Sequence, residues 1–468
     1  MSVHRTSLAC IAACLSLFAP ILPRAAAQSQ QTPPKAFTLE QTVDYTLQNY
    51  PAIRASLEQV SAAQAGVTLA KTNYLPRADL LWQGNRATRN NVFGLLLPQS
   101  VISPISGPVL PSSSNDSVWG SAAGLLFTWE PFDFGRRGAT VNAARAGQNL
   151  ANSQVSVTRL DIAVAATNAF FNVVAAQQRV AAARADVERR QVLANVVHTL
   201  VTNQLRPGAD ASRADAELAH AKILLIQAEQ AEAIGRVVLA EFLGVNPDDV
   251  EINAGSLLGN PPDAKPPATP LTAHPFANAE QQRIGEIITR EHILDRSYFP
   301  RFYFQSTVYG RGTGANTDGT SQAGASGLGL DRSNWATGLT VTFPALDIFS
   351  IRAQKQIESA NERAERALYQ QTLDDLTSQS RQAQAALDGA RRVAENTPIE
   401  LQASREAEMQ ARARYEAGLA TIVEIAEAQG LLVQAETDDA LARLAVWNDL
   451  ALVNAAQGDL QPFIQLLH

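Results

Sequence analysis

Two acidic residues, Glu424 and Glu427, lie three positions apart just after a predicted turn between helices. Side chains three apart project from one face of a helix, so both carboxylates can act on the same space. Carboxylates placed in this way suit acid/base catalysis, a solvated helix face or a charged constriction in an aqueous passage. Asp215 and Glu217 follow a similar turn in the first half of the chain, beside Ala214, which aligns with Glu424. These four acids are the candidate gate and selectivity residues, and a solvated helix face is the alternative.

The other chemistry-bearing residues form no enzymatic pattern. The glycine-rich stretch 310–314 could suggest phosphate binding, but it follows a predicted strand and leads into a loop rather than a helix. The sequence therefore predicts a turn there. No two histidines have the spacing of metal ligands; they are His4, His198, His220, His274, His292 and His468. We expect no catalytic residue, no cofactor and no metal site.

Residues 1–27 have the features of a secretory signal peptide. A basic residue precedes an apolar run over 8–22, and small residues predict cleavage before Gln28. Both cysteines of the chain, Cys10 and Cys14, lie in this segment, and whether Cys14 is lipidated stays open. The exported chain therefore has no disulfide, and its stability must come from packing and assembly.

Charge and hydropathy argue against two further classes of protein. The formal net charge of the whole chain is −7, and it falls to about −9 once the signal peptide is removed, which disfavours nucleic-acid binding. Beyond the signal peptide there is no apolar run of about 18 residues, which excludes a transmembrane helix but not a transmembrane barrel.

One very long predicted helix dominates the elements that position the acids. From Ala139 to Leu205 the chain runs for about 67 residues without proline, and its apolar residues recur at helical spacing. Such a helix measures about 100 Å, several times the diameter of a small domain. Two heptad seams run along shifted faces, so the helix needs partner helices on more than one side. A return helix over about 211–242 follows a tip at Pro207 and Gly208.

Four shorter segments show the period-two alternation of strands with one apolar face. They are residues 78–85, 119–129, 302–308 and 335–343. Tryptophans on the apolar faces are typical of the aromatic girdles of membrane barrels. The loops between paired strands, at 87–116 and 311–332, are rich in Asn, Ser and Gly. We expect both loops to face the outside of the cell.

The order helix, strand, strand, long helix, return helix occurs twice, about 224 residues apart at first. Tyr74-Leu75-Pro76 is echoed by Tyr298-Phe299-Pro300, and the second long helix is predicted over about 350–415. We therefore divide the chain into four parts. They are a signal peptide (1–27), a first repeat (28–244), a linker (245–275) and a second repeat (276–468).

The predicted fold class is α+β, with long antiparallel helical hairpins and four transmembrane strands. Four strands cannot close, and each unpaired backbone group at an open edge in lipid costs several kcal/mol. Two copies would give eight strands, whose interior is filled by side chains, whereas three give twelve and leave room for water. We therefore expect a homotrimer with a twelve-stranded barrel, continued by the helices as a closed tube.

The sequence resembles the TolC family of outer-membrane efflux and secretion channels. The resemblance rests on the paired Tyr-Leu-Pro and Tyr-Phe-Pro junctions, on the segment 131–137 and above all on residues 415–429, a Tyr-x-x-Gly tip followed by two acids. It implies a homotrimer in outer-membrane lipid with a periplasmic tube that docks with a periplasmic adaptor protein and an inner-membrane pump. Exposed tips with small residues suit docking; the candidate adaptor contacts are Pro207, Gly208, Gly418 and Leu419.

The sequence departs from the family pattern near the second tip. Glu424 and Glu427 stand where the best-known members have aspartates, and Ala420 stands at a position that is basic in them. Pro398 falls inside the second long helix, where it should kink the helix or remove a backbone hydrogen bond. The contacts of a closed gate are therefore left open by the sequence.

The predicted function is that of the outer-membrane channel of a tripartite system that exports small molecules. One alternative is the duct of a type I protein secretion system, because the inner-membrane partner selects the cargo and this chain does not identify it. The alternative outside transport is an exported coiled-coil protein for adhesion or scaffolding, which would have no barrel.

Overall fold

The computed structural model describes residues 36–88, 114–264, 269–318 and 320–467. These residues belong to one compact unit, Ala36–His468. The predicted signal peptide and most of the predicted loop 87–116 lie outside the described residues.

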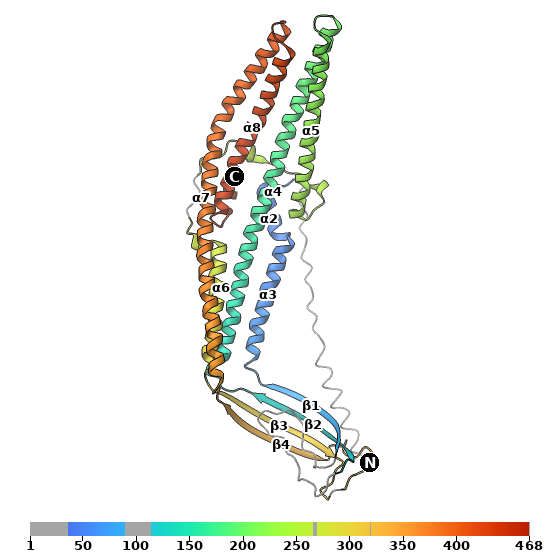
Figure 1. Cartoon of the computed structure of the whole chain (residues 1–468), viewed down its shortest axis with the longest axis vertical. Helices are drawn as coiled ribbons and strands as arrows, with labels where there is room; N and C mark the ends of the chain where they lie inside the picture. The colour runs from blue at the N-terminus through green and yellow to red at the C-terminus, as the bar shows by residue number, and fades with distance from the viewer. Residues whose placement is uncertain (1–35, 89–113, 265–268, 319, 468) are drawn as a thin grey trace. The chain divides into compact units, whose positions relative to one another are not determined.

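The tandem order of elements predicted from the sequence is confirmed (Figure 1). After α2 (Leu39–Asn49), the first repeat consists of α3 (Pro51–Thr72), β1 (Arg77–Thr88), β2 (Ser117–Trp129), α4 (Arg136–Thr202) and α5 (Gly208–Leu243). Three short 3-10 helices follow, η2 (Pro247–Asp249), η3 (Gly255–Leu258) and η4 (Leu271–Ala273). The second repeat consists of α6 (Pro275–Arg296), β3 (Arg301–Thr313), β4 (Arg332–Thr342), α7 (Asp347–Glu416) and α8 (Ile422–Ala455), before α9 (Gln461–Ile464) and η5 (Gln465–Leu467).

The long helix α4 has partner helices on several sides, as its two heptad seams predict. It packs against α3, α5 and α6 and also contacts α2 and α8. Its middle contributes Phe170 and Val173 to the main core, where they are fully buried with Trp447 and Leu450 of α8. Among the described helices, α4 has the length and hydropathy to cross a membrane, but half of that apolar stretch is buried inside the protein. Burial of this kind is typical of a core helix that is covered by its neighbours.

The segment between α5 and α6 lies against the helices. Phe37 pairs in parallel with Ile252, and Val250 and Leu257 are buried in the main core. The next repeat then begins as the previous one did, because α3 and α6 both start with proline at the first helical position. Proline is favoured there because its missing N–H would have no partner within the helix.

The four strands form one antiparallel sheet in the order β1-β2-β3-β4. The register sets Leu80 opposite Leu125, Leu125 opposite Val308, and Val308 opposite Trp335. Directly opposed residues share a face of a sheet, and all four of these side chains are exposed, Leu80 at 85% and Trp335 at 76%. One face of the sheet therefore carries an uncovered apolar row across all four strands.

The glycine-rich stretch 310–314 is not the turn that the sequence predicts. Residues 310–313 continue β3, and β4 begins only at Arg332. The loop between them folds back on the apolar face, where the Ser121 hydroxyl donates to the carbonyl oxygen of Gly329 at 3.2 Å. A Cβ atom at Gly312 would overlap that same carbonyl oxygen. Glycine is therefore needed here for a close backbone approach within a strand, a use that composition alone does not distinguish from a turn.

We expect Gly312→Val to release this loop from the strand. The added side chain must displace the Gly329 carbonyl, and overpacking of this kind costs about 2 kcal/mol. Proteinase K added to intact cells should then cut the loop roughly thirtyfold faster, because cleavage follows the population of the open form. Gly84→Val is the matched control, since a Cβ at Gly84 meets only the Trp82 ring at 3.4 Å. Equal cleavage of the two variants would contradict the docking of the loop, and cleavage only after cell lysis would contradict its outside location.

Candidate functional site

The two hairpin tips have the same backbone geometry. Each is a five-residue connection, from Asn203 to Pro207 between α4 and α5 and from Ala417 to Thr421 between α7 and α8. The amides of Leu205 and Leu419 each donate to the carbonyl five residues earlier, at 2.8 Å in both cases. The residue before each leucine has a positive φ, 61° at Gln204 and 78° at Gly418. This left-handed residue ends each helix and lets the chain reverse.

This geometry corrects the alignment of the two tips that the sequence suggests. Gly208 is the first residue of α5 and therefore matches Ile422, not Gly418. By the same helix positions Asp210, and not Ala214, matches Glu424. Aligning Gly208 with Gly418 is wrong because the residue with a left-handed backbone in the first tip is Gln204 and not a glycine.

The corrected alignment places Arg206 opposite the position of Ala420, and Arg206 connects the two tips. Its guanidinium donates to the carbonyl oxygens of Tyr415 at 2.7 Å and of Ala420 at 3.4 Å. It also lies 4.4 Å from the centroid of the Tyr415 ring, a cation–π contact. We call Arg206 and Tyr415 the tip clasp. The sequence has Ala420 at the position expected to be basic, and in the structure a basic side chain from the first tip, Arg206, reaches the Ala420 carbonyl.

The clasp packs against apolar side chains from both hairpins. Tyr415 is 1% exposed and packs with Val197 and Ile425, among other residues. Its hydroxyl donates to a carboxylate oxygen of Asp210 at 3.4 Å. Burial and the Asp210 charge raise the pKa of the Tyr415 phenol, although Arg206 opposes the shift. Tyr415 therefore stays protonated and remains a donor near neutral pH.

The two acids of the second tip have different roles in the structure. Glu424 forms a capping box with Thr421, whose backbone N–H donates to the Glu424 side chain at 3.1 Å. A capping box satisfies backbone donors at the start of a helix. The guanidinium of Arg414 lies 3.8 Å from the Glu424 carboxylate. Glu427 is exposed on α8. Both acids lie away from the buried face of α8 that contains Ile425.

The two acids of the first tip are paired within their own hairpin. Asp215 lies 2.8 Å from His198 Nε2, with both side chains about half exposed. Glu217 pairs with Arg190 at 2.8 Å, and Arg190 also holds the buried Asp186 at the same distance. The Arg190 guanidinium therefore offsets part of the charge of Glu217.

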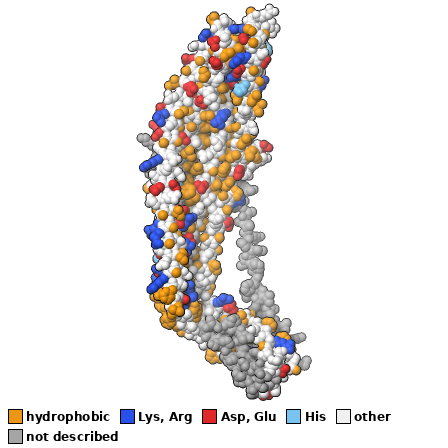
Figure 2. Space-filling model, in the orientation of Figure 1, with side chains coloured by type: hydrophobic (Ala, Val, Ile, Leu, Met, Phe, Trp, Pro, Cys, Tyr) orange, Lys and Arg blue, Asp and Glu red, His pale blue; other side chains and the backbone are white. Residues whose placement is uncertain are grey.

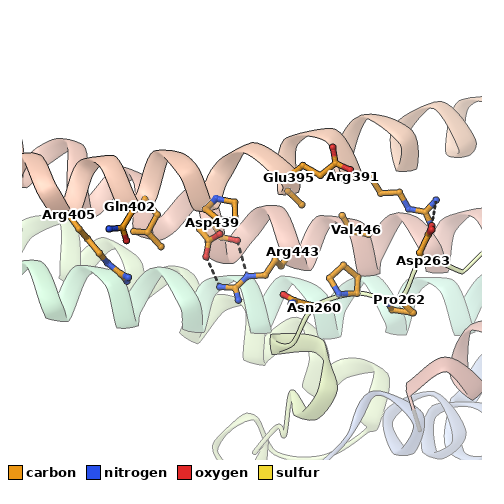
Figure 3. A pocket seen from close by; sticks show the side chains of 14 residues that line it. Asn260, Pro262, Asp263, Arg391, Glu395, Gln402, Arg405, Asp439, Arg443 and Val446 are labelled. Atoms are coloured by element: carbon orange, nitrogen blue, oxygen red, sulfur yellow. Dashed lines mark hydrogen bonds and ion pairs between the residues drawn. The ribbon is translucent and has the colours of Figure 1, made fainter.

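Pro398 does not end α7, which continues through it to Glu416. A groove of about 760 Å³ lies beside the proline, between α7, α8 and the segment 260–263 (Figure 3). Two of its arginines are held by carboxylates: Arg443 donates to Asp439 at 2.7 Å, and Arg391 lies 3.6 Å from Asp263. The first pair lies within α8, whereas Arg391 of α7 also donates to the carbonyl oxygen of Ala264 at 2.8 Å and so ties the linker to the second hairpin beside the groove.

The ends of the tips are apolar. Leu205 and Leu419 are 68% and 72% exposed, and the candidate contacts Pro207 and Gly208 are exposed as well. Hydrophobic and charged side chains are interspersed over the visible face of the hairpins (Figure 2). The two exposed leucines and the exposed backbone beside them give each chain a small surface against which a partner could pack.

A protein-family model described as "Outer membrane efflux protein" matches residues 42–245 and 308–459. Among curated proteins, Protein CyaE of Bordetella pertussis is 26% identical over 228 residues, which are 48% of this chain and 44% of CyaE. The chain thus spans less than half the length of that relative.

Solved structures with the same fold include two outer-membrane channels. The Campylobacter jejuni CmeC channel aligns with a TM-score of 0.70 at 17% identity, over 91% of this chain and 88% of CmeC. The open state of the Neisseria gonorrhoeae MtrE channel aligns with a TM-score of 0.70 at 18% identity, over 90% of this chain and 89% of MtrE.

Proposed function

This chain belongs to the outer membrane efflux protein family, and from that premise we propose that it is the outer-membrane duct of a tripartite system exporting small molecules. Three copies form the duct, and it receives its cargo from an inner-membrane pump through a periplasmic adaptor. Family membership favours this function over a coiled-coil scaffold.

The observation that carries the proposal is the four-stranded sheet with its uncovered apolar row. The row suits contact with lipid acyl chains, while β1 and β4 each have one edge without a neighbouring strand in the described sheet. An open edge in lipid is costly, so the edges must pair with other copies of the chain. Three copies give twelve strands, which is enough for a water-filled bore.

The tips supply the periplasmic end of the duct. In the proposal, Leu205, Leu419 and the neighbouring Pro207, Gly208 and Gly418 contact the adaptor. The tip clasp holds the two hairpins of each chain together while no adaptor is bound, which keeps the passage narrow.

Glu424 and Glu427 form the charged constriction of the proposed duct. Repeated by threefold symmetry they place six carboxylates around the passage, and a low-dielectric wall concentrates their field. Cations should therefore pass in preference to anions, most clearly at low ionic strength. Asp215 and Glu217 add less in this proposal, because Arg190 holds Glu217 at 2.8 Å. The contact of Glu424 with Arg414 is longer, at 3.8 Å, and Glu427 has no ion pair among the described residues.

The test is ion selectivity in a planar bilayer with the double variant Glu424→Gln and Glu427→Gln. Glutamine keeps the capping box of α8, whereas alanine would remove the bond that the Thr421 backbone N–H donates to the side chain of residue 424. The variant should lose most of its cation preference and show weaker block by multivalent cations. The matched control removes two acids of the first tip, Asp215→Asn and Glu217→Gln, and should change selectivity less. Unchanged selectivity in the first variant would mean that its acids are only a solvated helix face.

A further inference from the structure

The two helices that lead into the sheet each end with a basic residue. Lys71 lies in the last turn of α3 and Arg296 in the last turn of α6, whereas α4, α5 and α8 have no basic residue in their last turns. Both side chains are exposed, and neither forms an ion pair among the described residues. The acid next to Arg296, Asp295, is already paired with Lys355 at 2.6 Å. Each helix therefore presents a positive charge that no described carboxylate offsets.

Each of these cations lies three residues before an exposed aromatic residue at the junction of helix and sheet. The backbone N–H of Tyr74 donates to the carbonyl oxygen of Lys71 at 3.1 Å, and that of Phe299 donates to the carbonyl oxygen of Arg296 at 3.4 Å. These bonds continue the helical turn, so the cation and the ring lie near the same face. Tyr74 is 46% exposed and Phe299 is 39% exposed.

Both aromatic residues border the face of the sheet that carries the apolar row. The indole N–H of Trp129 donates to the carbonyl oxygen of Tyr74 at 3.4 Å. Phe299 stacks on Phe134 with ring centroids 5.0 Å apart, and Phe134 lies 6.2 Å from Phe302. By the strand register, Trp129 and Phe302 lie on the apolar face. The two cations therefore lie one helical turn beyond the end of an apolar surface, and Figure 2 shows Lys and Arg side chains beside apolar ones where the helices adjoin the sheet.

We propose that Lys71 and Arg296 bind the phosphate groups of anionic phospholipids in the periplasmic leaflet of the outer membrane. The inference rests on the proposed function, which places the apolar face among the acyl chains and the helices in the periplasm. Aromatic rings lie at the boundary between lipid and water, and long basic side chains reach from there to the headgroups. A lipid with a net negative charge is attracted to such cations more strongly than a zwitterionic one. A basic residue in a last turn also stabilises its helix through the macrodipole, a role that requires no lipid.

The test is lipid binding to the purified, detergent-solubilised protein, measured by native mass spectrometry. The protein is titrated with phosphatidylglycerol and, separately, with phosphatidylcholine that carries the same acyl chains. The wild type should bind phosphatidylglycerol about fivefold more tightly, which is the contribution of one basic residue near an anionic lipid surface, and high salt should reduce this preference. The junction variant, Lys71→Gln with Arg296→Gln, should bind both lipids equally.

The matched control variant is Lys222→Gln with Arg405→Gln. These two residues lie on α5 and α7 in the halves nearer the tips, are exposed and form no ion pair among the described residues. The control removes the same charge as the junction variant but should keep the preference for phosphatidylglycerol. Loss of the preference in the control as well would show that overall charge and not the junction selects the lipid, which overturns the inference.

Conductance in a planar bilayer separates this inference from the proposed function. A wild type that conducts but binds the two lipids equally overturns the lipid site alone. A junction variant that unfolds at a lower temperature but keeps the preference also overturns it, because Lys71 and Arg296 then act only on their helices. Absence of conductance in the wild type counts against the duct. A preference that the junction variant loses and the control variant keeps supports the site whatever the conductance.

Discussion

Replacing Arg206 with alanine is expected to raise the single-channel conductance several-fold. The substitution removes two hydrogen bonds from a charged donor and one cation–π contact. Together these are worth about 3 kcal/mol, which corresponds to about a hundredfold change in the ratio of closed to open tips. Tyr415 would keep its contacts with the apolar side chains around it, so each chain should still fold and assemble.

Planar-bilayer recordings of the purified protein would measure this change. Arg213→Ala is the matched control, because Arg213 belongs to the same tip region and its one ion pair among the described residues is an exposed contact of 3.6 Å with Glu217. Exposed ion pairs contribute little, so the control should conduct like the wild type. Arg206→Ala channels with the wild-type conductance would show that the clasp does not hold the passage closed.

The second large effect is expected from Gly418→Trp, which should abolish export while the trimer still assembles. Among the described residues, no atom beyond the two chain neighbours lies within 4 Å of a Cβ built on Gly418, so the indole would project from the tip into the proposed adaptor surface. Export would be measured as resistance to a toxic compound in cells lacking the native channel. Assembly would be followed by comparing heated and unheated samples on a gel.

The φ of 78° at Gly418 requires a control for backbone strain. Any residue with a Cβ costs roughly 1–2 kcal/mol in this conformation, so Gly418→Ala introduces the strain without the bulk. We expect the alanine variant to export nearly as well as the wild type. If alanine and tryptophan abolish export equally, then strain and not docking explains the loss. Normal export by the tryptophan variant would exclude this tip as the docking surface.

The elements with strong periodicity could be predicted from the sequence, because burial on one side imposes a repeating pattern. Helix α4 and the strands with one apolar face are examples, and on that face Leu80 and Trp335 are among the most exposed apolar residues. The end of β3 was missed because Gly312 has no side chain to continue the alternation, and its role depends on Gly329, which is distant in the sequence.

The tip clasp could not be predicted for a related reason. Arg206 and Tyr415 lie in different repeats, and no periodic pattern connects two single residues so far apart. One local feature gives the correct alignment of the tips. The connections between the paired helices have the same length, so counting from the start of each return helix aligns Asp210 with Glu424. Matching the two glycines instead assigned that position to Ala214.

The stoichiometry of the detergent-extracted protein tests the central claim most directly, namely that other copies of the chain complete the four-stranded sheet. Native mass spectrometry after extraction of the outer membrane should give a complex of three chains, which denaturation separates into single chains because the described residues contain no cysteine for a covalent link. A single chain released into aqueous buffer without detergent, or a stable complex of two, would contradict the account.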